Sequence, residues 1–243
     1  MDLEVAECAS PSLLPTAKTT YEAKFLASEE TIARLEDAIA DRLMLDPHVD
    51  LGERAYEVET LYFDTVEFGV YRKASGFRTT KHRIRRYGLS ENAFLERKTK
   101  SQGRVRKFRT TVPVADLART IEVPNDDSRW FAARVSARSL APVCKIAYER
   151  TAYYGEGDTG PIRITFDRRL RACVAVDLDF QSAVRYMPLP ISGVIVELKF
   201  TESMPMLFKN AVQAFGLTTT STSKYRAAVE ALRLGPAGEI RHA

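Results

Sequence analysis

A pattern of alternating residue types recurs in three short stretches of the chain: "YEAKF" (21–25), "FLERKTK" (94–100) and "VIVELKF" (194–200). Each stretch contains Glu-x-Lys, with apolar residues at positions of opposite parity. Because successive side chains of a β-strand point to opposite faces, each predicts a strand with one charged and one apolar face. A single strand of this kind commonly turns its charged face to water. Three of them favour charged faces that converge on a polar interior.

Positive charge is concentrated in one part of the sequence. Residues 72–109 contain 14 Lys or Arg and two Glu, a net charge of +12 in a chain whose total is +4. In "KHRIRRY" (81–87), parity places Lys81, Arg83, Arg85 and Tyr87 on one face of a strand. Such a block indicates a polyanionic partner: nucleic acid, a phosphorylated small molecule or an anionic membrane surface. A solvated basic face is the alternative.

The order of the expected elements favours an α+β fold in a single domain. Periodicity and turn residues predict strands at 21–28, 55–65, 77–87, 92–100, 104–112, 143–155, 161–176 and 193–200. The strands at 77–112 are expected to form an antiparallel meander. Helices are expected at 29–46 (capped by Ser28 and stopped by Pro47), 66–75, within 114–140 (with a cap at Ser128), at 204–215 and from 224.

The sequence also limits the compartment and the type of site. The N-terminus has no basic and apolar regions of a signal peptide, and no apolar run is long enough to span a membrane. Three widely spaced cysteines make a disulfide framework or a zinc site unexpected, so we expect a cytoplasmic protein without an integral membrane segment. The three histidines (His48, His82 and His242) read as incidental surface residues.

Cations facing one another inside a protein require compensation. Two like charges 4 Å apart repel by about 4 kcal/mol at an effective dielectric constant of about 20. An extended phosphate chain would offset them, since Arg forks match phosphate oxygens and Lys acts as a point charge. Interleaved carboxylates would orient the cations or hold a divalent metal that bridges phosphate oxygens, and the candidates are Glu22, Glu96, Asp167 and Glu197.

The charged and aromatic stretches of the sequence form an ordered series of motifs: "YEAKF", "LYFDT", "YRK", "HRIRRY", "FLERKT", "RKFR", "YERTAY", "RITFD", "VELKF" and "SKY". This series resembles the VTC domain, the polyphosphate polymerase branch of the triphosphate tunnel metalloenzymes in the CYTH-like superfamily. The resemblance covers residues 20–232, with 1–19 expected as a flexible leader and 233–243 as a tail. It implies an antiparallel eight-stranded β-tunnel with helices packed outside.

The resemblance also implies residue roles. The family's catalytic phosphate-binding cations correspond to Lys24, Arg72, Arg83, Arg85, Lys98, Lys107, Arg150, Arg163, Lys199 and Lys224. Further substrate contacts correspond to Tyr148 and Ser223, with Glu96 and Glu22 as acidic partners that orient neighbouring Lys and Arg. Glu197 matches the family's metal-binding glutamate, with Mn²⁺ or Mg²⁺ as the expected ion.

Three positions depart from the family pattern or stay open. Thr20 replaces the first Glu of the superfamily's Glu-x-Glu-x-Lys signature, which weakens a simple triphosphatase reading. Ser221 stands where the fungal form has a further Lys. In "RVRKFR", either Arg106 or Lys107 could face inward.

The function implied is transfer of the ATP γ-phosphate to a growing polyphosphate chain, with metal assistance. ATP and inorganic polyphosphate or pyrophosphate are the expected partners, and nucleic acid is not expected. Hydrolysis of inorganic or nucleotide triphosphate is an alternative, and so is non-catalytic polyphosphate binding. Nucleic-acid binding would instead require cations on outward faces beside exposed aromatic residues.

Overall fold

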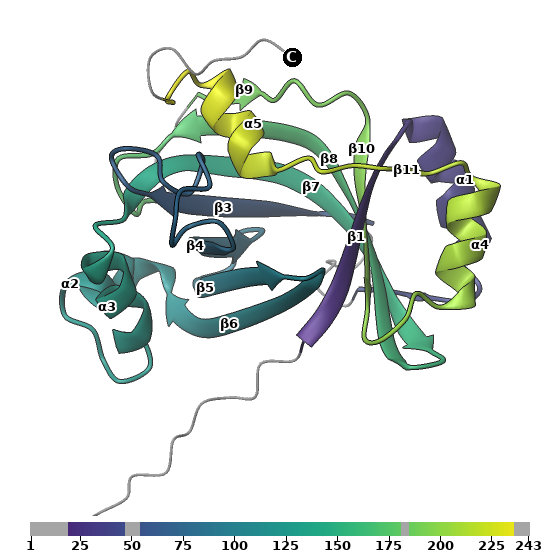
Figure 1. Cartoon of the computed structure of the whole chain (residues 1–243), viewed down its shortest axis with the longest axis horizontal. Coiled ribbons are helices and arrows are strands. Elements are labelled where there is room, and N and C mark those ends of the chain that lie inside the picture. The colour runs from purple at the N-terminus through teal and green to yellow at the C-terminus, as the bar shows by residue number, and fades with distance from the viewer. Residues whose placement is uncertain (1–18, 47–53, 181–184, 236–243) are drawn as a thin grey trace, which may run out of the picture.

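The computed structural model describes residues 19–46, 54–180 and 185–235, which form one closed antiparallel barrel with helices around it (Figure 1). Its eight main strands follow the order β7-β3-β4-β5-β6-β1-β10-β8, and β8 pairs again with β7 to close the wall. The eight-stranded antiparallel tunnel expected from the sequence is therefore confirmed. The expected leader and tail fall almost entirely outside the described residues.

The described elements have the following bounds. The barrel strands are β1 (Thr19–Ala27), β3 (Tyr56–Asp64), β4 (Thr80–Tyr87), β5 (Asn92–Ser101), β6 (Arg104–Pro113), β7 (Ala141–Gly157), β8 (Gly160–Val174) and β10 (Val194–Phe200). Two-residue strands at its margins are β2 (Met44–Leu45), β9 (Met187–Pro188) and β11 (Thr218–Thr219). The helices are α1 (Glu29–Ile39), α2 (Leu117–Glu122), α3 (Arg129–Ala137), α4 (Met206–Ala214) and α5 (Lys224–Ala231), with a 3₁₀ turn at Val114–Asp116.

The apolar outer faces of the strands pack against the helices. Figure 1 shows α1 and α4 together at one side of the barrel and α2 and α3 at the opposite side. Ile32 of α1 and Phe208 of α4 share a fully buried cluster with Phe25 and Phe166 of the wall. On the other side, Phe131 of α3 is buried in the second cluster, which also contains outward-facing strand residues such as Ile84. Burial of these outer faces leaves the inner faces to the polar residues.

Helix α5 has a different position from the other helices. It packs against β7 and β8, and Tyr225 stacks on the ring of Tyr62, with ring centroids 5.2 Å apart. Tyr62 lies opposite Arg83 and therefore belongs to the inner face of the wall. Helix α5 thus covers part of the barrel near the end of β3.

The structure corrects two predicted helices. The first ends at Ile39 rather than at 46, and the following residues form a turn and β2, which pairs with β7. Pro47, its expected stop, lies outside the described residues. Residues 66–75 form consecutive turns rather than a helix. The buried carboxylate of Asp64 accepts the backbone N–H groups of Thr65, Val70 and Tyr71, which fixes a compact turn in place of helical hydrogen bonds.

The two predicted helix caps and the predicted surface histidines have different outcomes. Ser28 caps α1 as predicted, accepting a hydrogen bond from the backbone N–H of Thr31. Ser128 occupies the N-cap position of α3, but its hydroxyl bonds to Asn125 and makes no capping bond. His82 is 3% exposed beneath α3, so its interpretation as a surface residue was wrong. His48 and His242 lie outside the described residues.

Candidate active site

Strand register places most of the predicted phosphate-binding cations on one continuous inner face. Residues directly opposite each other on paired strands share a face, and the rows run around the barrel. One row links Thr60 to Arg85 and Phe94, and the next links Tyr62 to Arg83 and Glu96. The same pairing brings inward eight of the ten predicted cations: Lys24, Arg83, Arg85, Lys98, Lys107, Arg150, Arg163 and Lys199.

Register also decides between the two candidates on β6. Lys107 lies opposite Lys98, and its Nζ is 3.1 Å from Glu96 Oε1. Arg106 lies opposite Thr99 and therefore faces outward. Lys107 is the inward residue.

Glu96 lies at the centre of one group of cations. Its carboxylate is fully buried and bonds to Arg83 (2.7 Å), Lys107 and Arg109 (2.5 Å). Burial alone would raise the pKa of Glu96, but these cations and Arg85 outweigh it and hold that pKa well below its usual range. Glu96 thus stays ionised and orients the cations around it.

Asp167 orients a second group of cations, at the end of the barrel covered by α5. It is fully buried and accepts two hydrogen bonds from Arg150, at 2.6 and 2.8 Å, and one from Lys224 at 2.6 Å. Lys224 is the first residue of α5, so the helix delivers this cation to the site. The ring of Tyr148 lies beside both cations, 4.9 Å from Lys224 Nζ and 5.2 Å from Arg150 Cζ.

Glu22 and Glu197 each pair with lysines of the inner wall. Glu22 lies opposite Lys199 but bonds to Lys98 of β5, two strands away along the wall, at 2.5 Å. Glu197 lies opposite Lys24, with 3.7 Å between Nζ and Oε2, and pairs with Lys199 at 3.1 Å. The two carboxylates are diagonal neighbours on β1 and β10.

The donor set around these carboxylates bears on metal binding. The described residues contain no cluster of three or more His, Cys, Asp or Glu that could hold a metal alone. Glu22 Oε1 is buried and has no hydrogen-bond partner among them, although its other oxygen is paired. A buried carboxylate oxygen without a partner is costly unless a ligand satisfies it. Glu22 and Glu197 therefore fit a divalent ion whose remaining ligands are phosphate oxygens and water, as is common for Mg²⁺.

The lysines of the tunnel have unusual proton affinities. Burial, followed by neighbouring charges such as Lys224 beside Lys24 and Arg83 beside Lys81, lowers the pKa of both lysines to about 8. Burial likewise lowers the pKa of Lys107 and of Lys199 to about 8. Tyr87 shows the converse: burial would raise its pKa, but Arg85 and Arg109 lower it to about 7. Burial is thus the main cause of the lowered lysine pKa values, whereas nearby positive charge lowers the pKa of Tyr87.

Some tunnel residues were missed in the predicted set. Lys81 donates a hydrogen bond to Ser223 (2.9 Å), and Arg109 donates to Tyr87 (2.9 Å) as well as to Glu96. Asp167 was expected only as one of several interleaved carboxylates. The parity of "KHRIRRY" already placed Lys81 with Arg83, so a signal was present for it.

Two predicted site residues, Arg72 and Ser223, lie outside the barrel strands. Arg72 is exposed on the turn segment between β3 and β4, and the structure does not bring it into the inner rows of the barrel. The hydrogen bonds of Asp64 fix this segment as a turn in place of the helix predicted at 66–75. Ser223 caps α5 and accepts from Lys81, whereas Ser221 is exposed.

Arg163 is held by an acidic residue at another margin of the tunnel. It donates to Asp46, next to β2, and to the hydroxyl of Tyr56 at 3.1 Å. Its Nε is buried and has no hydrogen-bond partner among the described residues. Arg163 therefore has a donor left for a ligand.

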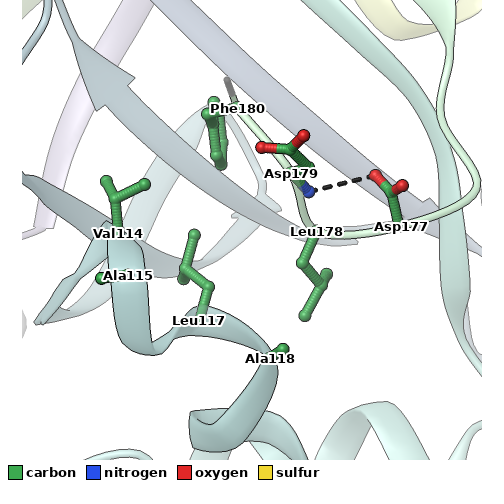
Figure 2. A pocket seen from close by; sticks show the side chains of 8 residues that line it. All are labelled: Val114, Ala115, Leu117, Ala118, Asp177, Leu178, Asp179 and Phe180. Carbon is green, nitrogen blue, oxygen red and sulfur yellow. Dashed lines mark hydrogen bonds between the residues drawn. The ribbon is translucent and has the colours of Figure 1, made fainter. Parts of the chain in front are cut away.

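A pocket of about 420 Å³ lies outside the tunnel, between the start of α2 and residues 177–180 (Figure 2). Leu117, Leu178 and Phe180 give it an apolar lining, and its two carboxylates are Asp177 and Asp179. The backbone N–H of Asp179 donates to Asp177 at 3.1 Å. This lining does not suit a phosphate chain, which leaves the tunnel as the candidate site.

Comparison with solved structures supports this fold. A putative adenylate cyclase from Bacillus halodurans matches 85% of this chain and 94% of its own, with a TM-score of 0.53 and 15% identity. A putative adenylate cyclase from Vibrio parahaemolyticus matches 87% and 98%, with a TM-score of 0.50 and 12% identity. A putative adenylyl cyclase from Hippeastrum, described as having a dominant triphosphatase activity, matches 93% and 100%, with a TM-score of 0.49 and 14% identity. At these identities, the likeness to the first two structures shows the fold alone.

The remaining findings concern related sequences and the length of the helices. No curated protein sequence matches the chain. In the described part of the chain, every helix is too short or too polar to cross a bilayer. The VTC domain family matches residues 19–233. The chain belongs to the VTC domain family and has the triphosphate tunnel fold.

Proposed function

We propose that the chain is a polyphosphate polymerase that transfers the γ-phosphate of ATP to an inorganic polyphosphate chain inside the barrel. The observation that carries this proposal is the convergence of Lys and Arg side chains on the inner wall, from every barrel strand except β3. Membership of the VTC domain family supports it. The enclosed charge suits a linear polyanion, which can extend along a barrel.

The chain's own residues would bind and position the phosphates. Arg83, Arg85 and Arg150 are each less than 10% exposed and held by fixed carboxylate, hydroxyl or aromatic partners, so their remaining N–H groups are preorganised. Arg matches phosphate oxygens in a bidentate manner, and Lys24 and Lys199 would add point charges. Most of the catalysis would then come from alignment and charge stabilisation rather than from a protein nucleophile.

The proposed step exchanges one phosphoanhydride bond for another. A terminal oxygen of the acceptor phosphate attacks the γ-phosphorus of ATP, and the bond between that phosphorus and the β,γ-bridging oxygen breaks. ADP leaves with the bonding electron pair, and the polymer gains one phosphate. Arg85 and Arg150 would stabilise the charge that spreads over the transferred group. A divalent ion at Glu197 and Glu22 would supply additional neutralisation of that charge.

The test is synthesis of polymer from ATP labelled at the γ-phosphate, with Mn²⁺ or Mg²⁺, followed by separation of the polymer by size. We expect labelled polyphosphate, with one ADP released for each phosphate that is added to the polymer. Arg83→Ala, Arg85→Ala and Glu197→Ala should abolish synthesis while circular dichroism shows an intact fold. Wild-type synthesis in all three variants would overturn the assignment.

Two other results would replace this proposal with a different function. Release of phosphate from tripolyphosphate without chain growth would make the chain a triphosphatase. Tight, salt-sensitive binding of polyphosphate without any ATP consumption would make it a binding protein.

A further inference from the structure

A group of arginines lies on the outer face of the barrel, away from the tunnel. Strands β5 and β6 contribute Arg97 and Arg106, and α3 with its C-cap contributes Arg134 and Arg138. Among the described residues, none of these four arginines forms an ion pair with a carboxylate. We call these four residues the outer arginine surface. Within the described part of the chain, no ion pair offsets its positive charge.

Three of the four arginines, Arg97, Arg134 and Arg138, lie around one buried histidine. His82 lies directly opposite Arg97 on paired strands, and its ring meets the ring of Phe131 on α3 at a centroid distance of 6.0 Å. Arg134 follows Phe131 by one helical turn. His82 is 3% exposed, and its Nε2 has no hydrogen-bond partner among the described residues. Burial, and then Arg138, Arg97 and Arg134, lower the pKa of His82 to about 4.

The outer arginine surface is continuous with the tunnel wall. Along β5 and β6, consecutive residues alternate between the two faces: Arg97 faces outward beside inward Lys98, and Arg106 faces outward beside inward Lys107. The β5–β6 hairpin carries Lys100 and Arg104 at its exposed tip. Cations therefore occur on both faces of the hairpin and at its end.

We propose that the outer arginine surface binds inorganic polyphosphate outside the tunnel, holding the part of a long chain that extends past the barrel. This inference rests on the proposed function, because it assumes that the tunnel itself holds phosphates. A flexible polyanion with one charge per phosphate can follow the hairpin from the inner to the outer row, whereas a short triphosphate cannot reach both. The surface would add affinity only for long chains.

The aromatic residues on this surface favour a phosphate chain over a nucleic acid. Phe108 and Trp130 are half-buried and pack on each other, with ring centroids 4.4 Å apart. The indole N–H of Trp130 donates to Thr110 at 2.8 Å, and Arg97 lies over Phe108. Single-stranded nucleic acids use open aromatic faces for base stacking, and these rings are already in contact with other side chains.

The experiment compares two ligands and two triple variants of the full chain. The test variant is Arg97→Ala/Arg134→Ala/Arg138→Ala. The control variant, Arg34→Ala/Arg42→Ala/Lys209→Ala, also removes three charges, but from the side of the barrel with α1 and α4 (Figure 1). Isothermal titration measures the affinity of each protein for tripolyphosphate and for long-chain polyphosphate over a range of salt concentrations. Thermal unfolding checks that each variant is folded.

For the test variant, we expect about tenfold weaker binding of long-chain polyphosphate and unchanged binding of tripolyphosphate. The slope of log Kd against log salt for the long chain should fall by about 1 for each arginine that contacts a phosphate. Long-chain affinity equal to that of the control variant would overturn the inference while leaving the proposed function intact. Failure of the wild type to bind either ligand would instead overturn the proposed function.

Two further outcomes complete the test. Loss of binding to a single-stranded RNA oligonucleotide, with long-chain polyphosphate binding retained, would assign the surface to nucleic acid and overturn the inference. If the triple variant does not fold, the single variant Arg134→Glu serves instead, because Arg134 is exposed on α3. It should weaken long-chain binding and leave tripolyphosphate binding unchanged, and equal long-chain affinity would again overturn the inference.

Discussion

Lys24 lies directly opposite Glu197 on the paired strands β1 and β10, and 3.7 Å separates Nζ from Oε2. The next inward-facing pair on the same strands, Glu22 with Lys199, has the reversed order of charge. The two carboxylates therefore lie on a diagonal, with a cation beside each. The cations Lys98, Lys199 and Lys24 hold the pKa of Glu22 below its usual range against the effect of burial, so this carboxylate stays ionised.

The first prediction concerns Glu197→Gln, which removes one charge of this diagonal and keeps the shape of the side chain. We expect Mn²⁺ binding in the presence of tripolyphosphate to weaken by about 100-fold, because Glu22 would be the remaining carboxylate ligand. Isothermal titration of Mn²⁺ measures this. The matched control is Glu149→Gln, whose carboxylate pairs with the exposed Arg169 outside the tunnel. Equal Mn²⁺ affinity in both variants would remove Glu197 from the metal site.

The second prediction concerns stability. Glu96→Gln leaves Arg83, Lys107 and Arg109 without their shared buried anion, so the empty protein should lose about 3 kcal/mol of unfolding free energy. Tripolyphosphate should restore more stability to this variant than it adds to the wild type, since it replaces the missing negative charge. Chemical denaturation with and without ligand measures both effects.

The control for this experiment is Glu57→Gln, which removes a partly exposed partner of Arg171. We expect this control to lose less than about 1 kcal/mol of unfolding free energy. Tripolyphosphate should stabilise it as much as it stabilises the wild type. A Glu96→Gln variant as stable as this control would show that Glu96 does not hold the cation group together.

The inner face of the barrel could be predicted from sequence where strands alternate cleanly. In "VIVELKF" the parity of Glu197 and Lys199 was enough to assign their face, and the register confirms that assignment. In "RVRKFR" alternation alone could not distinguish Arg106 from Lys107, because both faces carry cations. Pairing with Lys98 decides it, and pairing is a property of the whole sheet.

Long-range contacts explain what the sequence could not show. The turn at 66–75 reads as helical, but the Asp64 carboxylate bonds to Tyr71 N–H and also accepts the Tyr225 hydroxyl at 2.5 Å. That bond joins the turn to α5, which is far away in the sequence. Likewise, Asp46 reaches Arg163 only because β2 pairs with β7. No local pattern in the sequence specifies such contacts.

The third prediction concerns pH. The pKa values of Lys24, Lys81 and Lys199 are lowered to about 8, so each loses charge in the empty tunnel as the pH rises through that value. A bound polyanion favours the charged form and raises these pKa values, so binding takes up protons near pH 8.5. Affinity for tripolyphosphate should therefore be highest below pH 8 and should fall above it.

Titrations in buffers of different ionisation enthalpy measure this proton uptake directly. The variant Lys81→Arg should show reduced uptake, because Arg stays protonated throughout this range. Binding without proton uptake at pH 8.5, after allowance for titration of the ligand itself, would contradict the prediction.

The fourth prediction concerns the acidic residue that competes for a phosphate-binding cation. Asp46 is 5% exposed and holds Arg163, so a ligand must share or displace this ion pair to use the guanidinium fully. Asp46→Asn keeps a hydrogen-bond acceptor for Arg163 and removes the negative charge. We expect metal-free tripolyphosphate to bind about fivefold more tightly, which corresponds to about 1 kcal/mol for a partly exposed pair. Combining Asp46→Asn with Arg163→Ala should abolish the gain, because the effect acts through that guanidinium. If the double variant keeps the tighter binding, Asp46 acts through the general field of the tunnel and Arg163 is not the phosphate contact.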